Sequence, residues 1–205
     1  MTAPSEQAFL LKLLGLAFAY PNEALLSTLR DVAKNIGRNN VAVKKLIAAF
    51  EQDELEIVQG EYTRLFINGY PKTPCPPYES VYREQRMLGN ASLEVQESYM
   101  EWGMTVDTPL SDHLATELEF LSFLASAESE PSIAEEAVEA TQHFMTAHID
   151  RWVPQFSNDL QKSATLDVYK QLAALLTEAL TVPNSRNAAG TINNNNNSSS
   201  ITNGG

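Results

Sequence analysis

The sequence predicts an all-α protein with one compact helical domain, and three observations lead to this prediction. Apolar residues recur at three- and four-residue spacing in one segment after another, the pattern of helices with a buried face. No segment alternates apolar and polar residues with the two-residue period of a strand. With 205 residues, 43% of them hydrophobic, the chain can bury one good core. We therefore expect roughly nine helices in a single domain.

Four of these helices lie before residue 70. The first, from about residue 5 to residue 19, has apolar residues on most of its circumference, which is typical of a central helix. Three more are predicted at residues 22–37, 43–50 and 53–69. Asp53 and Glu56 have the spacing of a capping box, in which the two side chains bond backbone groups of the first turn. We therefore expect Asp53 to begin the fourth helix.

Five further helices are predicted after residue 79, at residues 80–88, 92–102, 111–125, 131–154 and 165–180. Pro109 and the pair Ser111 and Asp112 precede the third of these, where Asp112 is a candidate N-cap. Pro154 has no backbone N–H, so we expect the long helix to end there. The helical domain is predicted to span residues 1–182. Residues 183–205 are rich in Asn and Ser with almost nothing to bury, so we expect a disordered tail.

Charge excludes some classes of partner. The chain has 14 Lys and Arg against 26 Asp and Glu, a net charge of −12. Binding of nucleic acid requires a basic face, so we expect no nucleic-acid partner. A cationic partner is favoured instead.

The number of cysteines and the N-terminal sequence bear on the cellular compartment of the protein. Cys75 is the single cysteine, so a reducing compartment is the simpler assumption. The apolar run of residues 9–20 contains Lys12, has no basic segment before it and is too short to span a bilayer. We therefore expect a cytoplasmic protein with no stable insertion in a membrane.

The stretch of residues 70–83, YPKTPCPPYESVYR, differs most from its surroundings. Its four prolines prevent a regular helix or a central strand, which predicts a structured loop between two helical blocks. Tyr78, Glu79, Ser80 and Tyr82 come after the last of these prolines, Pro77. Polar groups on a loop held by a rigid helical scaffold are typical of a functional site.

Other interpretations of this loop stay open. Pro71, Pro74 and Pro77 form a ladder that a partner domain could bind as a polyproline II ligand, which would make the chain a scaffold protein. The loop could also be a plain linker with its tyrosines packed on the core.

Candidates for catalysis are few. Cys75 and His113 could form the nucleophile and base of a small hydrolase, but no further signature of such a site is present. His113 and Glu117 lie four residues apart on one helix face, and two ligands without a third are a weak metal signal. A structural alternative has Asp112 capping the helix and His113 pairing with Glu117. Phosphate-binding and dinucleotide motifs are missing, so we expect neither metal nor cofactor.

Three segments together resemble a known family. PCPPYESVY (74–82), PLSDHLATELEFL (109–121) and HIDRWVPQF (148–156), in this order in an acidic helical chain, are similar to the TorD/DmsD/NarJ family of redox-enzyme maturation chaperones, which are dedicated to molybdoenzymes. The resemblance covers the body of the chain, and the middle segment is its most specific part. It implies an all-helical cytoplasmic chaperone rather than an enzyme.

The resemblance also implies a partner. Such chaperones bind the catalytic subunit of a molybdenum-cofactor oxidoreductase, often through a twin-arginine signal peptide, and delay export until cofactors are in place. It further implies that a homodimer can form by exchange of helical segments. An acidic surface suits such a peptide, because arginine pairs with carboxylates through two hydrogen bonds.

We expect the first and second segments to meet as the wall of one groove. The predicted client-binding residues are Tyr78, Glu79, Ser80, Tyr82, Asp112, His113 and Glu117. Glu79 and Glu117 are expected to pair with client arginines, with little contribution to stability.

Overall fold

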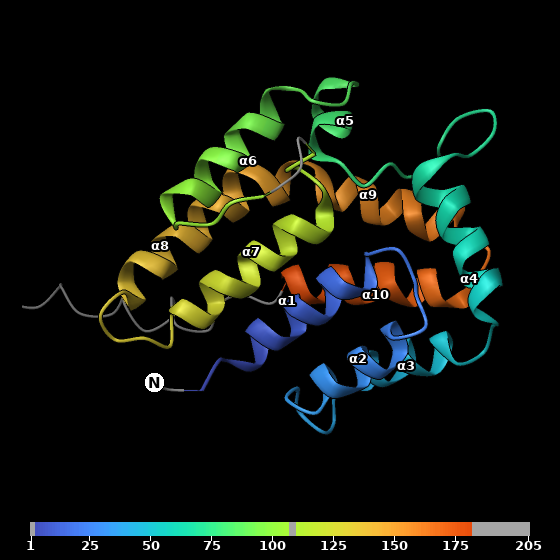
Figure 1. Cartoon of the computed structure of the whole chain (residues 1–205), viewed down its shortest axis with the longest axis horizontal. Helices are drawn as coiled ribbons and strands as arrows, with labels where there is room; N and C mark the ends of the chain where they lie inside the picture. Colours follow the sequence, from blue (N-terminus) through green and yellow to red (C-terminus); the bar gives the residue numbers. More distant parts are fainter. Residues whose placement is uncertain (1–2, 107–109, 182–205) are drawn as a thin grey trace, which may run out of the picture.

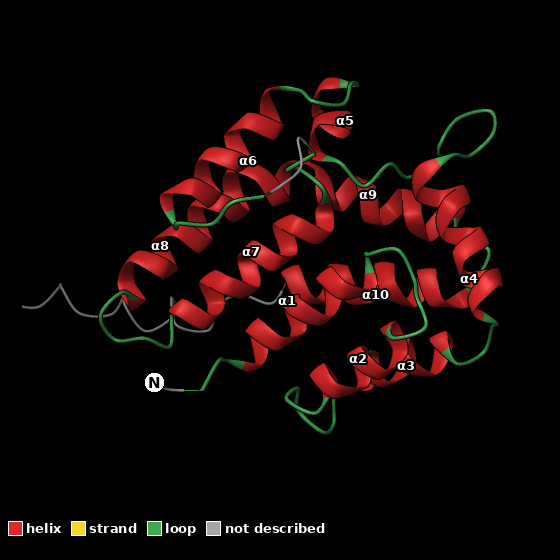
Figure 2. Ribbon diagram, in the orientation of Figure 1, coloured by secondary structure: helices red, strands yellow, loops and turns green. Residues whose placement is uncertain are grey.

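The computed structural model describes residues 3–106 and 110–181, and Figure 2 shows helices joined by loops throughout this part. The helices are α1 (Glu6–Ala17), α2 (Leu25–Ala33), α3 (Val41–Phe50), α4 (Leu55–Tyr62), α5 (Glu79–Glu84), α6 (Asn90–Glu101), α7 (Leu114–Ala127), α8 (Ala134–Phe144), α9 (Asp150–Ser163) and α10 (Asp167–Thr181). Two π-helical turns, η1 (Thr63–Ile67) and η2 (Met145–Ile149), extend α4 and join α8 to α9. The described residues therefore form nine continuous helical segments and no strand, which confirms the all-α prediction.

Helix α1 lies at the centre of the domain, as its apolar circumference predicts. It packs along α7 and also contacts α2 and α10 (Figure 1). Seven of its twelve residues are buried. One buried core extends from α1 through α7, α9 and α10, so the described residues form a single domain.

A glycine allows α1 and α7 to approach closely. A Cβ atom on Gly15 would lie 3.1 Å from the carbonyl oxygen of Ala115 in α7, a contact tighter than most side chains make. The hydroxyl of Ser122 in α7 donates a hydrogen bond of 2.8 Å to the carbonyl of Ala8 in α1. The close approach of α1 and α7 thus depends on the missing side chain at Gly15 and on one buried hydrogen bond.

The buried carboxylate of Glu61 ties α4 to the α9–α10 connection. It accepts hydrogen bonds from the backbone N–H and the hydroxyl of Thr165, at 2.6 and 2.8 Å, and from the guanidinium of Arg64. Arg64 also donates to the carbonyl of Ser163 at 2.7 Å. Burial alone raises the pKa of Glu61, but the bonds from Arg64 and Thr165 outweigh it and lower the pKa to about 2.

Several predicted helix boundaries are wrong, among them the end of the helix predicted at residues 80–88, which is Glu84. The long helix continues through η2 and Pro154 to Ser163. Pro154 removes one i to i−4 bond, but α9 buries Trp152, Val153, Phe156 and Leu160 in the core, and this packing maintains the helix. The capping box at Asp53 does not form either, since the N-cap position of α4 is Glu54 and no side chain bonds the first turn. Pro109 and the predicted tail, residues 183–205, lie outside the described residues.

Within residues 3–106 and 110–181, none of the helices combines the length and the hydropathy that crossing a bilayer requires.

Gly15 and Gly60 give opposite predictions for stability. We expect Gly15→Val to lower the free energy of unfolding by about 2–3 kcal/mol, since the new side chain meets the backbone of α7. Gly60→Ala in α4 should raise it by about 0.5–1 kcal/mol, because nothing lies within 4 Å of the added methyl and helical Ala is favoured over Gly. Urea unfolding measures both. A neutral Gly15→Val would show that the α1–α7 contact is looser than described.

Candidate functional site

The end of the proline loop and the start of α7 meet in a short antiparallel bridge between Tyr78 and His113. The backbone N–H of Glu79 donates to the carbonyl of Asp112 at 3.1 Å, and the N–H of Leu114 donates to the carbonyl of Pro77 at 2.9 Å. Two segments more than thirty residues apart are therefore joined through their main chains. The structure thus brings the first two sequence segments together.

Asp112 is the side chain that fastens this junction. It is fully buried, its Oδ2 accepts the backbone N–H of Ser80 at 2.7 Å, and its Oδ1 accepts the hydroxyl of Ser92 at 2.7 Å. The hydroxyl of Ser111 donates to the carbonyl of Ser92, and that of Tyr99 to the carbonyl of Ser111. One carboxylate therefore connects the first turns of α5 and α6 to the segment before α7.

The predicted roles of Asp112 and His113 at the start of α7 are wrong. The N-cap is His113, whose Nδ1 accepts the backbone N–H of Ala115 at 3.1 Å. Its ring packs edge-on against Tyr78 and makes no pair with Glu117. Asp112 does not cap α7 because both of its oxygens bond groups of α5 and α6. Among the described residues, no cluster of three or more His, Cys, Asp or Glu side chains could hold a metal ion.

Glu79 and Glu117 lie buried beside the same junction, with different partners. Glu79 accepts from Arg83 at 2.5 Å and lies 2.9 Å from Nδ1 of His148. Glu117 accepts the indole N–H of Trp152 at 3.2 Å, and no donor bonds its other oxygen, Oε1, among the described residues. Glu117 also has Glu79 as a side-chain hydrogen-bond partner, and this contact raises its pKa. Two potential cations face Glu79, whereas no cation is bonded to Glu117.

This difference controls the charge of Glu117. Burial raises the pKa of Glu117 well above its usual range, and the nearby negative charges of Glu79 and Asp112 raise it further. The bond from Trp152 opposes this effect and is too weak to reverse it. We therefore expect Glu117 to be neutral at pH 7, whereas Glu79 is paired with Arg83.

Four of the seven predicted site residues are not on a groove wall. Glu79, Ser80, Asp112 and Glu117 each have 0% of their surface exposed, so the expectation that the two glutamates meet client arginines directly is wrong for this conformation. The three carboxylates bond groups of the chain itself: Glu79 pairs with Arg83, Asp112 bonds Ser80 and Ser92, and Glu117 bonds Trp152. Tyr78, Tyr82 and His113 are partly exposed, and their contact with a client stays a prediction.

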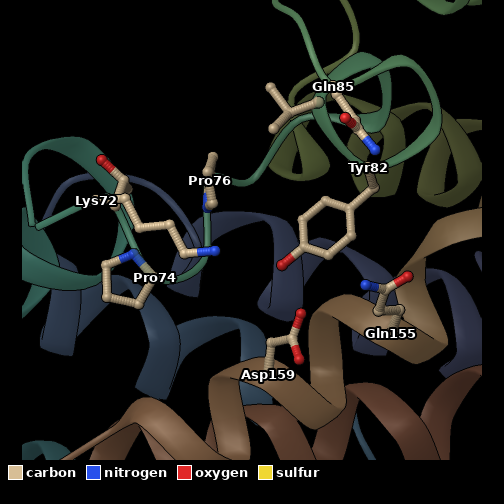
Figure 3. Close-up of a pocket in the computed structure, with 9 residues that line it drawn as sticks. Lys72, Pro74, Pro76, Tyr82, Gln85, Gln155 and Asp159 are labelled. Atoms are coloured by element: carbon tan, nitrogen blue, oxygen red, sulfur yellow. The ribbon is translucent and has the colours of Figure 1, made fainter.

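A cavity of about 590 Å³ lies beside the junction, between the proline loop, α5 and α9 (Figure 3). Its lining residues are Lys72, Thr73, Pro74, Pro76, Val81, Tyr82, Gln85, Gln155 and Asp159. Figure 3 shows the hydroxyl of Tyr82 pointing toward Asp159, with Lys72 on the facing side. Prolines and one valine supply apolar surface, and the amides and two charges supply polar contacts.

Tyr82 connects this cavity to the core. Its ring packs on Trp152 and Phe156, at centroid distances of 5.5 and 5.9 Å, and its hydroxyl bonds Asp159. Burial raises the pKa of the Tyr82 phenol far above its usual range, and the neighbouring Cys75 and Asp159 add to this. The cavity therefore presents a neutral hydroxyl and one carboxylate.

The hydrolase and scaffold alternatives do not fit this geometry. Cys75 is fully buried, and burial raises the pKa of its thiol to about 11, so the nucleophilic thiolate is scarce at neutral pH. His113 is occupied as a helix cap, and burial lowers its pKa to about 4. Pro77 is buried and its carbonyl is bonded to α7, so the proline ladder is not a free ligand.

Tyr82 is the one residue of the cavity lining that was predicted as a site residue; Lys72, Gln155 and Asp159 are among those that were not. For Lys72, the only indication of a role in the site was its position inside the proline loop. Gln155 and Asp159 were missed because the predicted helix ended at Pro154. His148 is a buried histidine whose partner, Glu79, could not be identified from the spacing of the residues.

Comparison with protein families supports the resemblance. The family model described as nitrate reductase delta subunit matches residues 19–158, which include the proline loop, the junction and most of α9. The match covers more than half of the chain, so the chain belongs to this family. This confirms the predicted membership of the TorD/DmsD/NarJ group.

Individual relatives share between a quarter and a third of their residues with the chain. It is 27% identical over 148 residues to the chaperone protein TorD of Vibrio cholerae, covering 66% of this chain and 67% of that protein. It is 29% identical over 138 residues to a chlorate reductase assembly chaperone protein of Ideonella dechloratans, covering 64% and 70%. A solved structure described as a candidate redox enzyme maturation protein of Archaeoglobus fulgidus is 28% identical, with a TM-score of 0.63 over 88% of this chain and 96% of that one.

Glu79→Gln and Glu117→Gln should differ in stability. Glu79→Gln leaves Arg83 and His148 without their carboxylate, so we expect a loss of about 2–3 kcal/mol in the free energy of unfolding at pH 7. Glu117→Gln replaces a neutral acid by a neutral amide of similar shape, and should cost less than about 1 kcal/mol. Urea unfolding of both variants at pH 7 decides this. Equal losses would contradict the expected neutral state of Glu117.

Proposed function

We propose that this protein is a cytoplasmic maturation chaperone for a molybdoenzyme of the DMSO and nitrate reductase type. It binds the catalytic subunit before export or assembly is complete, and it does so through an N-terminal segment that carries arginines followed by an apolar stretch. The observation that carries the proposal is the family match over residues 19–158, which contains the buried junction and every residue that lines the cavity except Asp159.

The names of the relatives support the chaperone role. They include TorD, a protein assigned as the Tat proofreading chaperone DmsD in Haemophilus influenzae, and assembly chaperones of chlorate and selenate reductases. The DmsD relative is 27% identical over 183 residues, which are 82% of this chain and 85% of that protein. Three of these names refer to an oxidoreductase or to export, so a reductase catalytic subunit is the proposed partner.

The cavity beside Tyr82 is the proposed contact for the client segment. Asp159 supplies a carboxylate for an arginine, and the ring of Tyr82 offers a face on which a guanidinium can stack. Pro74, Pro76 and Val81 form an apolar wall for the residues that follow the arginines. The net charge of −12 attracts the cationic segment from a distance.

The buried junction has an indirect role in this proposal. It holds the proline loop against α7 and α5 against α9, so the cavity is formed before the client arrives. Glu79 and Asp112 are therefore positioning residues in this proposal, and Tyr78, Tyr82 and His113 are the predicted residues that can touch a client. A homodimer formed by exchange of helices stays a prediction.

Calorimetric titration tests the site. The probe is a synthetic peptide with two adjacent arginines followed by an apolar run, taken from the N-terminus of a candidate catalytic subunit. Asp159→Asn should weaken its binding by about 1–2 kcal/mol, since a charge-assisted hydrogen bond becomes a neutral one. The matched control is Asp150→Asn, an exposed carboxylate on the same helix, which should bind like the unmodified protein.

Further outcomes distinguish an error in the proposed site from an error in the proposed function. Replacing the two arginines of the peptide by lysines should reduce affinity several-fold, because lysine cannot form the two-bond pair with a carboxylate. If Asp159→Asn and Asp150→Asn bind the peptide equally, the client site lies elsewhere. If neither the peptide nor the unassembled catalytic subunit of any molybdoenzyme tested binds the unmodified protein, the proposed function is wrong.

A further inference from the structure

The positive charge of this acidic chain is concentrated in one short segment. Residues 30–45 contain five of its 14 lysines and arginines, namely Arg30, Lys34, Arg38, Lys44 and Lys45, and a single acidic residue, Asp31. This segment has a net charge of +4, whereas the whole chain has −12. The proposed client site, which attracts cations, makes no use of this segment.

The fold turns this segment into a pocket. The end of α2, the connection after it and the first turns of α3 surround a cavity of about 350 Å³. Its charged lining residues are Arg30, Lys34, Arg38 and Lys44, all exposed, and no acidic residue lines it. Ala33, Ile36, Val43 and Ile47 supply an apolar floor. A basic rim around an apolar floor suits an anionic ligand that also has an apolar group.

Part of this positive charge has no acidic partner. Arg30 pairs with Glu51, and Lys34 pairs with Asp31 at 2.6 Å. Within the part of the chain that the structure describes, no carboxylate forms an ion pair with Arg38 or Lys44. Helix α3 begins at the same edge, and the positive end of its dipole adds to the field. Arg38 and Lys44 are therefore available to an external anion.

A second hollow of about 470 Å³ lies on the other side of the first turn of α3, between α3 and α10. It shares Asn40 with the first pocket and is lined by Asn39, Lys45 and Gln171, with Glu178 as its acidic residue. Amide side chains can bond an extended backbone through both donors and acceptors. The two hollows together suit a short stretch of chain that passes over the start of α3.

We propose that this surface binds an acidic segment of a partner protein, with one apolar side chain of that segment in the pocket between α2 and α3. Arg38 and Lys44 bind its carboxylates. A nucleic acid or an anionic membrane is too extended for this surface, because the remaining acidic surface would repel it. Figure 1 places α2 and α3 far from α5, so this segment and the proposed client segment can bind at the same time.

The probe is a fluorescently labelled nine-residue peptide with alternating Asp and Glu and a central Leu, titrated into the full chain at low ionic strength. We expect measurable binding that weakens as salt is raised. The double variant Arg38→Glu with Lys44→Glu should reduce affinity at least tenfold. Replacing the central Leu by Ser should reduce affinity several-fold, because the apolar floor loses its contact.

The matched control is Arg151→Glu with Lys162→Glu, two exposed cations on α9 that change the net charge by the same amount. It should bind the peptide with less than a threefold loss, and thermal melts should show that both double variants are folded. Equal losses in the two double variants would mean non-specific attraction and would overturn the proposal. Absence of peptide binding, tighter binding of inorganic phosphate than of the peptide, or self-association that the Arg38 and Lys44 changes abolish would also overturn it.

Discussion

The buried carboxylate of Asp112 is the constraint on which the site region depends. It is taken entirely out of water, which is costly for a charged group unless hydrogen bonds replace its solvation. The N–H of Ser80 and the hydroxyl of Ser92 supply these bonds. Because those two donors come from the starts of α5 and α6, satisfying one charge fixes three segments relative to one another. Since Val81 and Tyr82 of α5 line the cavity, we expect it to keep its shape only while α5 is held in this way.

The sequence predicts the helical scaffold well because a helix depends mainly on residues that are close together in the sequence. The apolar circumference of residues 5–19 identified α1 as a central helix, and roughly nine helices were expected where the described residues form nine continuous helical segments. The boundary errors at Asp53 and Pro154 arise where the chain departs from local rules. Near Pro154 a π-helical turn lies before the proline, and nothing in the spacing of the residues indicates such a turn.

The site was harder to predict because burial is a property of the whole fold. The sequence analysis predicts that Glu79 and Glu117 pair with client arginines, which requires both carboxylates to be exposed. In the structure both are buried: Arg83 of the chain itself pairs with Glu79, and Glu117 bonds Trp152. Asp159 was not predicted as a site residue, because the helix that carries it was expected to end at Pro154.

The surface has regions of opposite charge. Most of the chain is acidic and suits a cationic client segment, while the pocket between α2 and α3 is basic and suits an acidic one. A protein that has to hold an unfinished enzyme and then pass it on benefits from two surfaces of opposite charge, because two different partners can then bind without competing. Neither surface requires a catalytic group.

Hydrogen exchange tests most directly whether the Asp112 junction holds the site in place. In Asp112→Ala, the amides of residues 78–83 should exchange at least ten times faster than in the unmodified protein, since the N–H of Ser80 loses its acceptor and the bridge to α7 weakens. Amides in α1 and α10 should keep their protection. Unchanged exchange at residues 78–83, or an equal increase in α1 and α10, would contradict the central role of this carboxylate.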